Sequence, residues 1–331
     1  MRLLITGGMG FIGSNFVLHM LRQYPDYQIY NLDLLTYASH IDNLLEVASL
    51  PNYHFIQGDI CDKQLLSQLM NEGIDAVIHF AAESHVDRSI DNPFAFVDTN
   101  VQGTLALLEA ARVHKVKRFV QVSTDEVYGS LGGSGYFSET TPLAPNSPYS
   151  SSKAGADLLA RAYFHTYGLP VMTTRCSNNY GPRQFPEKLI PLTILRALNN
   201  EGIPLYGDGL NIRDWLYVDD HCSAIDLVLH HGGPGEVYNI GGHNEYTNIA
   251  IIRRILAELG KPESLIHYVK DRLGHDRRYA INAAKIRKEL GWVPNHHFES
   301  GIQKTVEWYV DNLQWRNKIA AGTHNKNNTL L

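Results

Sequence analysis

A tyrosine and a lysine four residues apart form the first pair in this sequence whose types and spacing suit chemistry. Tyr149 and Lys153 stand in the run Tyr-Ser-Ser-Ser-Lys, at the start of a segment with a helical pattern. Residues at this spacing share one face of a helix, which brings an ammonium near a phenol. The ammonium would stabilise the phenolate and lower the pKa of Tyr149 from its ordinary value of about 10. The tyrosine could then take a proton from a hydroxyl while hydride leaves the same carbon.

Three glycines near the N-terminus form a second chemical pattern. Gly7, Gly10 and Gly13 make a GxxGxxG motif between a strand-like run and a helical pattern. Glycine permits a tight turn and lets backbone N–H groups approach a pyrophosphate at a helix N-terminus. Asp33 ends the next strand-like run and can accept hydrogen bonds from both hydroxyls of an adenosine ribose. A carboxylate there would repel a 2′-phosphate, so the pattern predicts NAD as the cofactor.

Alternating apolar runs and helical patterns must position these residues. Apolar runs at 3–5, 28–32, 53–57, 76–80 and 119–122 alternate with helical patterns at 11–24, 65–71 and 101–114. Such an alternation predicts a parallel sheet covered on both faces, an α/β fold of the doubly wound Rossmann type. The second half is less regular, with helices expected at 249–259, 283–290 and 300–312. We expect it to form a smaller C-terminal α/β substrate-binding lobe over the carboxyl ends of the strands.

The domain boundaries follow from this division. We expect residues 1–175 to form the NAD-binding domain, and residues of about 211–247 to return to it. Residues 176–315 are expected to form most of the substrate-binding lobe. Residues 316–331, which are rich in Asn and Lys, are expected to form a disordered tail.

These motifs together resemble the extended short-chain dehydrogenase/reductase family, over residues 1 to about 315. Within that family, residues 123–129, Ser-Thr-Asp-Glu-Val-Tyr-Gly, resemble the segment in which dTDP-glucose 4,6-dehydratases place an acid and a base. The related 4-epimerases typically lack the Asp-Glu pair. The resemblance implies conversion of dTDP-glucose to its 4-keto-6-deoxy product, with tightly bound NAD that is regenerated in each turnover.

Such a dehydration needs three groups that handle protons. One helps to oxidise carbon 4, one removes the proton from carbon 5, and one protonates the hydroxyl that leaves carbon 6. Two adjacent carboxyls can do the last two jobs if their environments separate their pKa values. We expect Glu126 to be the base and Asp125 the acid, with the pKa of Asp125 raised by burial and by Glu126. Thr124 would hydrogen-bond the 4-oxygen beside Tyr149.

The resemblance also implies the binding residues. The expected cofactor contacts are Gly7, Gly10, Phe11, Ile12, Gly13, Asp33, Leu34, Thr36, Asp59, Ile60, Ala81, Ala82, Ser84, Thr99, Tyr149, Lys153 and Asn179. The expected substrate contacts are His85, Thr124, Asn178, Lys188, Leu189, Pro204, Tyr206, Arg213, Asn248, Arg272 and His275. Among them the arginines would hold the diphosphate, and Tyr206 would pack on the base.

Composition limits the partners. The chain has 331 residues and a formal net charge of -5, so it lacks the basic excess that binding nucleic acid requires. No apolar run reaches the roughly 20 residues that span a bilayer. The cysteines Cys61, Cys176 and Cys222 are odd in number and far apart, which argues against a disulfide framework and a zinc site. We therefore expect a cytoplasmic enzyme without a metal, and the family resemblance suggests a homodimer built from large-domain helices.

Three alternatives remain open. The first is a dehydratase of a UDP-, CDP- or GDP-linked hexose, since the methyl that separates thymine from uracil contributes only about 1 kcal/mol. The second is a nucleotide-sugar 4-epimerase, which the Asp125-Glu126 pair disfavours. The third is a binding protein that senses NAD, which should lack part of the Tyr–Lys or acid–base set.

Overall fold

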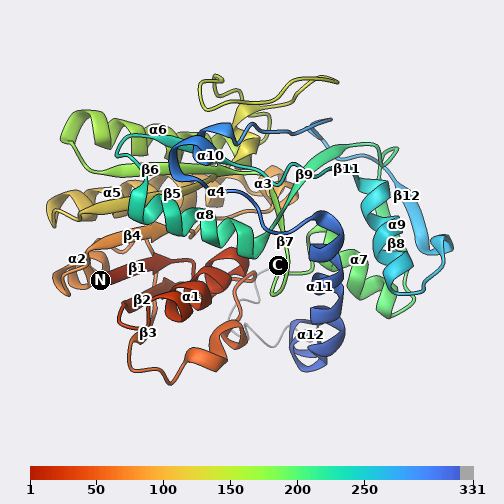
Figure 1. Ribbon diagram of the computed structural model, residues 1–331, viewed down its shortest axis with the longest axis horizontal. Helices are drawn as coiled ribbons and strands as arrows, with labels where there is room; N and C mark the ends of the chain where they lie inside the picture. The colour runs from red at the N-terminus through yellow and green to blue at the C-terminus, as the bar shows by residue number, and fades with distance from the viewer. Residues whose placement is uncertain (321–331) are drawn as a thin grey trace.

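A seven-stranded parallel sheet forms the larger lobe of the computed structural model, which describes residues 1–320 (Figure 1). The strands are β1 Arg2–Thr6, β2 Gln28–Asp33, β3 Tyr53–Gln57, β4 Ala76–His79, β5 Arg118–Thr124, β6 Val171–Cys176 and β10 Val237–Ile240. Their order is β10-β6-β5-β4-β1-β2-β3, and all neighbours are parallel. The order reverses between β1 and β4, which is where doubly wound folds bind their ligands. The predicted doubly wound Rossmann fold is confirmed.

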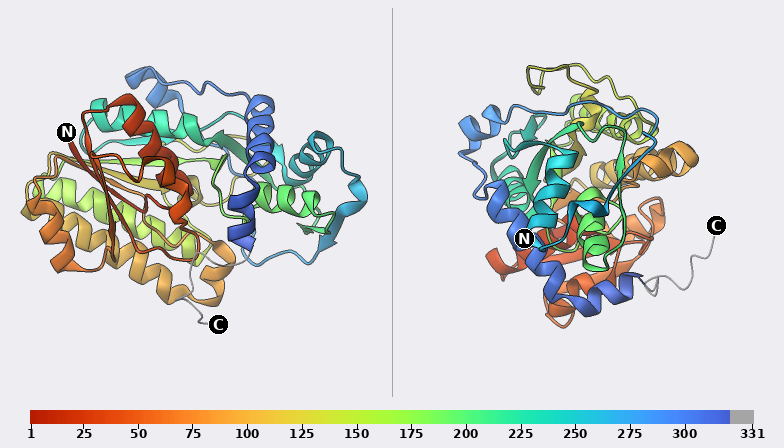
Figure 2. Two further views of the ribbon diagram at one scale, coloured as in Figure 1. Left: turned by 90° about the horizontal axis from the view of Figure 1, so that it is seen from below. Right: turned by 90° about the vertical axis from the view of Figure 1, so that its right-hand side faces the viewer.

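Helices cover both faces of this sheet (Figure 2, left). One face carries α1 Phe11–Gln23, α8 Val218–His231 and α10 Ala284–Leu290, and the other carries α2 Lys63–Asn71, α5 Thr104–Val113 and α6 Pro148–Tyr167. Leu3 and Ile5 belong to the apolar core on the first face, whereas Leu4 belongs to the core on the second. Successive side chains of a strand point to opposite faces, so burial on both faces explains the unbroken apolar runs.

One predicted helix is the last part of a longer helical region. The pattern at 101–114 predicts a single helix, but helical structure begins earlier, with α3 Val86–Asp91 and α4 Pro93–Phe96. A π-helical stretch, η2 Val97–Gly103, then leads into α5. Helix α4 begins with Pro93. Proline suits the first turn of a helix, because the N–H that it lacks would have no partner there.

A smaller lobe lies beyond the carboxyl ends of the large sheet (Figure 1). It contains a three-stranded sheet of β7 Asn178–Tyr180, β9 Ile212–Tyr217 and β11 Glu245–Thr247, and a parallel pair of β8 Ile203–Tyr206 and β12 Ile266–Val269. Its helices are α7 Leu189–Leu198, α9 Asn248–Glu258, α11 Phe298–Asp311 and α12 Leu313–Ala320. Three short helical turns complete the part of the chain that the structure describes, namely η1 Ile41–Val47, η3 Asp125–Tyr128 and η4 Glu263–Leu265.

The chain crosses between the lobes at different points from those expected. Of the segment 211–247, α8 packs against α1 and β10 joins the large sheet, but β9 and β11 pair with each other in the small one. Helix α10, which the expected boundaries place in the substrate-binding lobe, packs on β10 and α8. An apolar strand has the same sequence pattern whichever sheet it joins, so the pattern does not show where the chain passes from one lobe to the other.

The expected disordered tail is wrong in its first part. Residues 316–320 belong to α12, in which Trp315 and Ile319 are buried in the core of the smaller lobe. Their four-residue spacing puts both on one helix face, and that face packs against α11. Residues 321–331, the rest of the expected tail, lie outside the described residues.

Two features are absent from residues 1–320. None of the helices there combines the length and the apolar character that a membrane-spanning segment needs. In the same part of the chain, no three His, Cys, Asp or Glu side chains gather in a group that could hold a metal ion.

Candidate active site

A cavity of about 650 Å³ lies where the two lobes meet, and every site residue predicted from the sequence lines it. From the larger lobe come Gly7, Gly10, Phe11, Ile12, Gly13, Asp33, Leu34, Thr36, Asp59, Ile60, Ala81, Ala82, Ser84, His85, Thr99, Thr124, Asp125, Glu126, Tyr149 and Lys153. From the smaller lobe and the segments leading into it come Asn178, Asn179, Lys188, Leu189, Pro204, Tyr206, Arg213, Asn248, Arg272 and His275. The predicted residues therefore share one cavity, while their individual roles stay predictions.

The glycine turn between β1 and α1 leaves room that a side chain would fill. Gly7 has a φ of +73°, and a Cβ there would lie 2.6 Å from the backbone nitrogen of Ala81. A Cβ on Gly13 would lie 2.2 Å from the carbonyl oxygen of Gly7, whereas one on Gly10 would lie at 3.3 Å from the same oxygen. Two of the three motif glycines are thus required by contact. The first N–H groups of a helix have no partner within the helix, so the start of α1 suits an anion.

Asp33, at the end of β2, is fixed beside this turn. Its carboxylate accepts hydrogen bonds from the backbone N–H of Met9 at 2.9 Å and of Leu35 at 2.8 Å, and from the Ser39 hydroxyl at 2.9 Å. Burial raises the pKa of Asp33, and these donors oppose part of that rise. The two oxygens offer four lone-pair sites and these donors use three, so one site on Oδ2 remains for a ribose hydroxyl. The glycine turn and this carboxylate fit the pyrophosphate and the adenosine ribose of a dinucleotide.

Tyr149 and Lys153 lie in the first turns of α6, but their electrostatics differ from those expected. Helix α6 begins with a capping box formed by Ser147 and Ser150. The Lys153 ammonium donates to the carbonyl of Val122 at 2.8 Å. The pKa of Tyr149 is raised well above its ordinary value, first by burial and then by the charge of Glu126, and a hydrogen bond with Thr124 opposes this only in part. The expected lowering by Lys153 is therefore wrong for the chain by itself.

The two carboxyls occupy η3, directly after β5, and their surroundings differ. Asp125 is 1% exposed, and its pKa is raised well above the ordinary range by burial, then by Glu126 and Asp214. Its Oδ2 has no hydrogen-bond partner within residues 1–320. Burial also raises the pKa of Glu126, but three cations, Lys188, Arg272 and Arg213, oppose that rise. The expectation that burial and Glu126 raise the pKa of Asp125 is confirmed, and the arrangement suits a protonated Asp125 beside an ionised Glu126.

Cations from three segments surround the other end of the cavity. Arg213 is buried, its guanidinium lies 4.3 Å from the ring centre of Tyr279, and it donates to the carbonyl of Asp276 at 2.9 Å. Lys188 donates to the carbonyl of Ser84 at 2.8 Å. With Arg272, these side chains give a locally positive wall that suits a diphosphate, although the net charge of the chain is negative.

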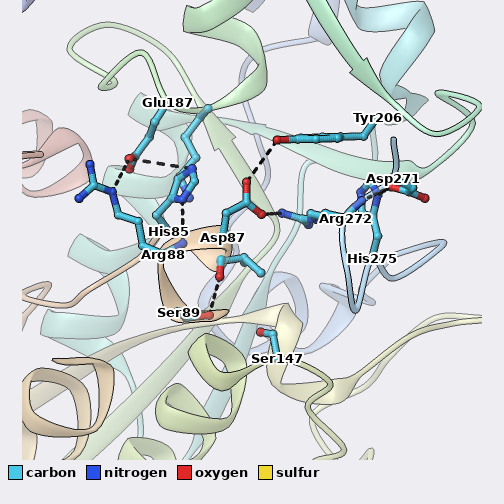
Figure 3. Close-up of polar contacts among 12 residues, drawn as sticks. His85, Asp87, Arg88, Ser89, Ser147, Glu187, Tyr206, Asp271, Arg272 and His275 are labelled. Carbon is cyan, nitrogen blue, oxygen red and sulfur yellow. Dashed lines mark hydrogen bonds and ion pairs between the residues drawn. The ribbon is translucent and has the colours of Figure 1, made fainter. Parts of the chain in front are cut away.

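Two acidic residues that sequence reasoning missed lie within this wall (Figure 3). Asp87 lies between Tyr206, whose hydroxyl donates to it at 3.4 Å, and Arg272, whose Nη1 lies 3.7 Å away. The only signal in the sequence was the position of Asp87 two residues after His85, in the segment that the family resemblance covers.

The second missed residue is Glu187. Its carboxylate accepts from the Tyr37 hydroxyl at 3.2 Å and lies 3.6 Å from Arg88 Nε and 3.9 Å from His85 Nε2. Burial is the main cause that lowers the pKa of His85, to about 4. His85 is therefore neutral near pH 7 and suits a hydrogen bond with a sugar hydroxyl better than an ion pair with a phosphate.

Comparisons with known proteins agree with this geometry. A family model described as GDP-mannose 4,6 dehydratase matches residues 4–305. The dTDP-glucose 4,6-dehydratase of Xanthomonas campestris pv. campestris (strain B100) is 54% identical over 340 aligned positions, which cover 97% of this chain and 96% of that protein. The chain belongs to the dTDP-glucose 4,6-dehydratase family.

Solved structures of dehydratases and of epimerases are similar to this chain. The dTDP-glucose 4,6-dehydratase of Streptomyces venezuelae, crystallised with NAD, has a TM-score of 0.93 and 52% identity, and the match covers 95% of this chain and 98% of that one. The UDP-glucose 4-epimerase of Thermotoga maritima has a TM-score of 0.88 and 30% identity, with coverage of 95% and 100%. The fold is thus shared with epimerases, and the greater sequence identity is with the dehydratase.

Proposed function

We propose that this chain dehydrates dTDP-glucose to dTDP-4-keto-6-deoxyglucose. The observation that carries the proposal is the pairing of a buried Asp125, whose pKa is raised well above the ordinary range, with a Glu126 that faces three cations, in one cavity with Tyr149 and the glycine turn. An epimerisation at carbon 4 removes no proton from carbon 5 and no hydroxyl from carbon 6, so it would not need such an acid–base pair. Bound NAD would supply the oxidation at carbon 4 and the reduction at carbon 6, and would end each turnover in its starting form.

The side chains of the cavity divide the proton transfers among them. Tyr149 takes the proton of the 4-hydroxyl, while Thr124 hydrogen-bonds the same oxygen. Glu126 takes the proton from carbon 5, which the neighbouring carbonyl has made acidic, and later returns it there. Asp125 gives its proton to the hydroxyl that leaves carbon 6, so that water departs. To take the proton of the 4-hydroxyl, Tyr149 must start as a phenolate, and its negative charge needs a positive partner, which the oxidised nicotinamide ring would supply.

The remaining residues hold the two ligands, as the family resemblance implies. Arg213, Arg272 and Lys188 would bind the diphosphate, and Tyr206 would pack on the base. The sugar and nucleotide contacts would be completed by His85, Asn178, Leu189, Pro204, Asn248 and His275. The cofactor contacts would be those of the glycine turn, Asp33 and the strand-end residues given above, with residues 1–175 as the main NAD-binding part and 176–315 as the main substrate-binding part.

A product assay with a panel of nucleotide-glucoses tests the proposal. We expect dTDP-glucose to give the keto-deoxy sugar without net NADH, and UDP-, CDP- and GDP-glucose to react more slowly. A 4-epimer without any keto sugar would instead identify an epimerase. Binding of NAD without any product would identify a sensor. Tyr149→Phe should abolish the oxidation, and an unimpaired variant would refute the role of Tyr149.

Dehydration of another nucleotide-linked hexose is the second candidate. The match to the GDP-mannose 4,6 dehydratase model supports it, because that name denotes the same reaction on a different base and sugar. In the panel, a guanosine or uridine substrate that outpaces dTDP-glucose would favour this candidate.

We also propose that the chain works as a homodimer in the cytoplasm. Four apolar side chains on neighbouring helices of the larger lobe are exposed, namely Phe94, Val97, Leu105 and Leu158. Since α5 packs against α6, a second copy could cover this face with the same helices. The free thiols of Cys61, Cys176 and Cys222 suit a reducing compartment. Sedimentation of the native chain and of Leu158→Glu would test the dimer.

A further inference from the structure

Asn43, in η1, connects three parts of the chain that are far apart in the sequence. It is 2% exposed. Its Nδ2 donates to the carbonyl of Met9 at 2.8 Å, and its Oδ1 accepts from the indole N–H of Trp315 at 2.8 Å. Its own carbonyl accepts from Nε of Arg183 at 3.1 Å. One buried side chain thus links the glycine turn to α12, and its backbone links both to the segment entering the smaller lobe.

The contact with Met9 is the part that concerns the cofactor. Met9 lies inside the GxxGxxG turn, and its N–H donates to Asp33 at 2.9 Å. Its carbonyl accepts from Asn43 and also from the backbone N–H of His40 at 3.1 Å. A turn rich in glycine has many accessible conformations when free, so these bonds restrict it to the one that presents its N–H groups.

Trp315, at the α12 end of this connection, is also held by buried contacts. Trp315 is buried, and its ring lies 5.1 Å from that of Trp308 and 5.9 Å from that of Tyr309, centre to centre. Arg183 also pairs with Glu46 of η1 at 3.0 Å. The last described helix of the chain is therefore joined to the glycine turn through buried contacts.

We propose that Asn43 is a positioning residue for the dinucleotide, and that Trp315 acts through it to set how slowly the cofactor leaves. The inference rests on the proposed binding of NAD at the glycine turn, and it extends that proposal to residues outside the cavity. Neither Asn43 nor Trp315 lines the cavity, so both act through the Met9 peptide and not by touching the cofactor.

The dissociation rate of NAD from three full-length proteins tests this. Trp315→Phe keeps an aromatic ring but removes the N–H that Asn43 accepts, and Trp308→Phe is the matched control, because it removes an indole from the same cluster without removing that bond. We expect Trp315→Phe to release NAD about tenfold faster than the native chain, the size expected for one lost buried hydrogen bond. The Kd for NAD should rise by a similar factor, and kcat at saturating NAD should change much less. Trp308→Phe should stay within about twofold of the native rate.

A second measurement separates positioning from simple loss of stability. A purely structural defect would lower the unfolding temperature equally with and without NAD, whereas loss of positioning should shrink the stabilisation that NAD provides. By reciprocity, NAD should slow amide exchange in η1 and α12 of the native chain. Asn43→Ala should repeat the effect of Trp315→Phe.

The outcomes are distinct. Equal NAD dissociation rates for the native chain and Trp315→Phe would overturn the inference and leave the proposed function standing. A native chain that binds no NAD would overturn the proposed function, and the inference with it.

Discussion

The two ends of the cavity are built in different ways. At the dinucleotide end, the ligand site is made of backbone atoms, two glycines without room for a Cβ, and a buried carboxylate held at 2.8 to 2.9 Å by its donors. At the sugar-nucleotide end, Lys188 and Arg213 donate to backbone carbonyls at 2.8 and 2.9 Å, but the contacts between side chains of the two lobes are longer, with Asp87 3.4 Å from Tyr206 and 3.7 Å from Arg272. Short buried bonds fix a geometry, whereas long ion pairs can rearrange around a ligand.

Such a contrast suits a ligand that is retained at one end and a ligand that exchanges at the other. A cofactor that stays through every turnover needs a preformed site, and a substrate that enters and leaves needs a site whose charges can exchange partners. The central carboxyls, Asp125 and Glu126, lie between the ends and combine the burial of one with the cations of the other.

The largest effect is expected at the glycine turn. Gly13→Ala would place a methyl 2.2 Å from the Gly7 carbonyl, so we expect NAD affinity to fall by about a thousandfold or more. Gly10→Ala is the control, since its methyl would lie 3.3 Å from the same carbonyl oxygen. The affinity of this variant for NAD should fall by less than about tenfold. Calorimetric titration with NAD measures both. Equal losses in the two variants would show that the turn is not rigid.

Asp125→Asn should separate stability from catalysis. We expect kcat to fall on the order of a hundredfold or more, because the leaving hydroxyl loses its acid. The folded-state pKa of Asp125 lies above that of the unfolded chain, so the native protein loses stability as pH rises from the ordinary carboxyl range towards that folded pKa. Asparagine does not ionise, and the variant should therefore be the more stable protein near pH 7, with the difference vanishing in acid. Thermal unfolding against pH measures this, and a variant less stable than the native chain near pH 7 would contradict the assigned protonation.

Arg272→Gln should weaken the sugar-nucleotide end alone. Removing one charged donor should reduce the affinity for dTDP by about ten- to a hundredfold and leave the affinity for NAD unchanged. Titration with each nucleotide in turn is the measurement. If NAD binding fell as much as dTDP binding, the two ends would not be independent.

Asp87→Asn is expected to have the smallest effect, and in the opposite direction. The carboxylate of Asp87 competes with a diphosphate for Arg272, so its removal should strengthen dTDP binding a few-fold at low salt. The gain should shrink as salt is added. Weaker binding of dTDP to Asp87→Asn at every salt concentration would mean that Asp87 positions Arg272 and does not compete for it.

The larger lobe was the more predictable part of the fold. Its strands are buried on both faces and alternate with helices, so composition alone marks them, and the glycine motif and Asp33 follow at fixed strand ends. The smaller lobe is built from short strands whose partners lie far away in the sequence, such as β12 with β8. The four-residue spacing of Trp315 and Ile319 could have predicted a helix with one buried face, but the polar residues around them favoured a disordered tail.

The electrostatics of the site were only partly predictable. The raised pKa of Asp125 follows from two adjacent carboxyls at a buried strand end. The raised pKa of Tyr149 does not follow from its spacing to Lys153, because it depends on the burial of the phenol and on the charge of Glu126, which the fold brings near it. Asp87 and Glu187 were missed for a similar reason, since their partners come from segments that only the folded chain brings together.

The most direct test of the central claim, that Asp125 and Glu126 reach the same hexose as the nicotinamide, is a rapid-mixing experiment with Glu126→Gln and dTDP-glucose. We expect the absorbance of NADH to appear and persist, because carbon 4 is oxidised but no base removes the proton from carbon 5. Quenched samples should contain the 4-keto sugar that still carries its 6-hydroxyl. Formation of the 6-deoxy product at the native rate would contradict the account.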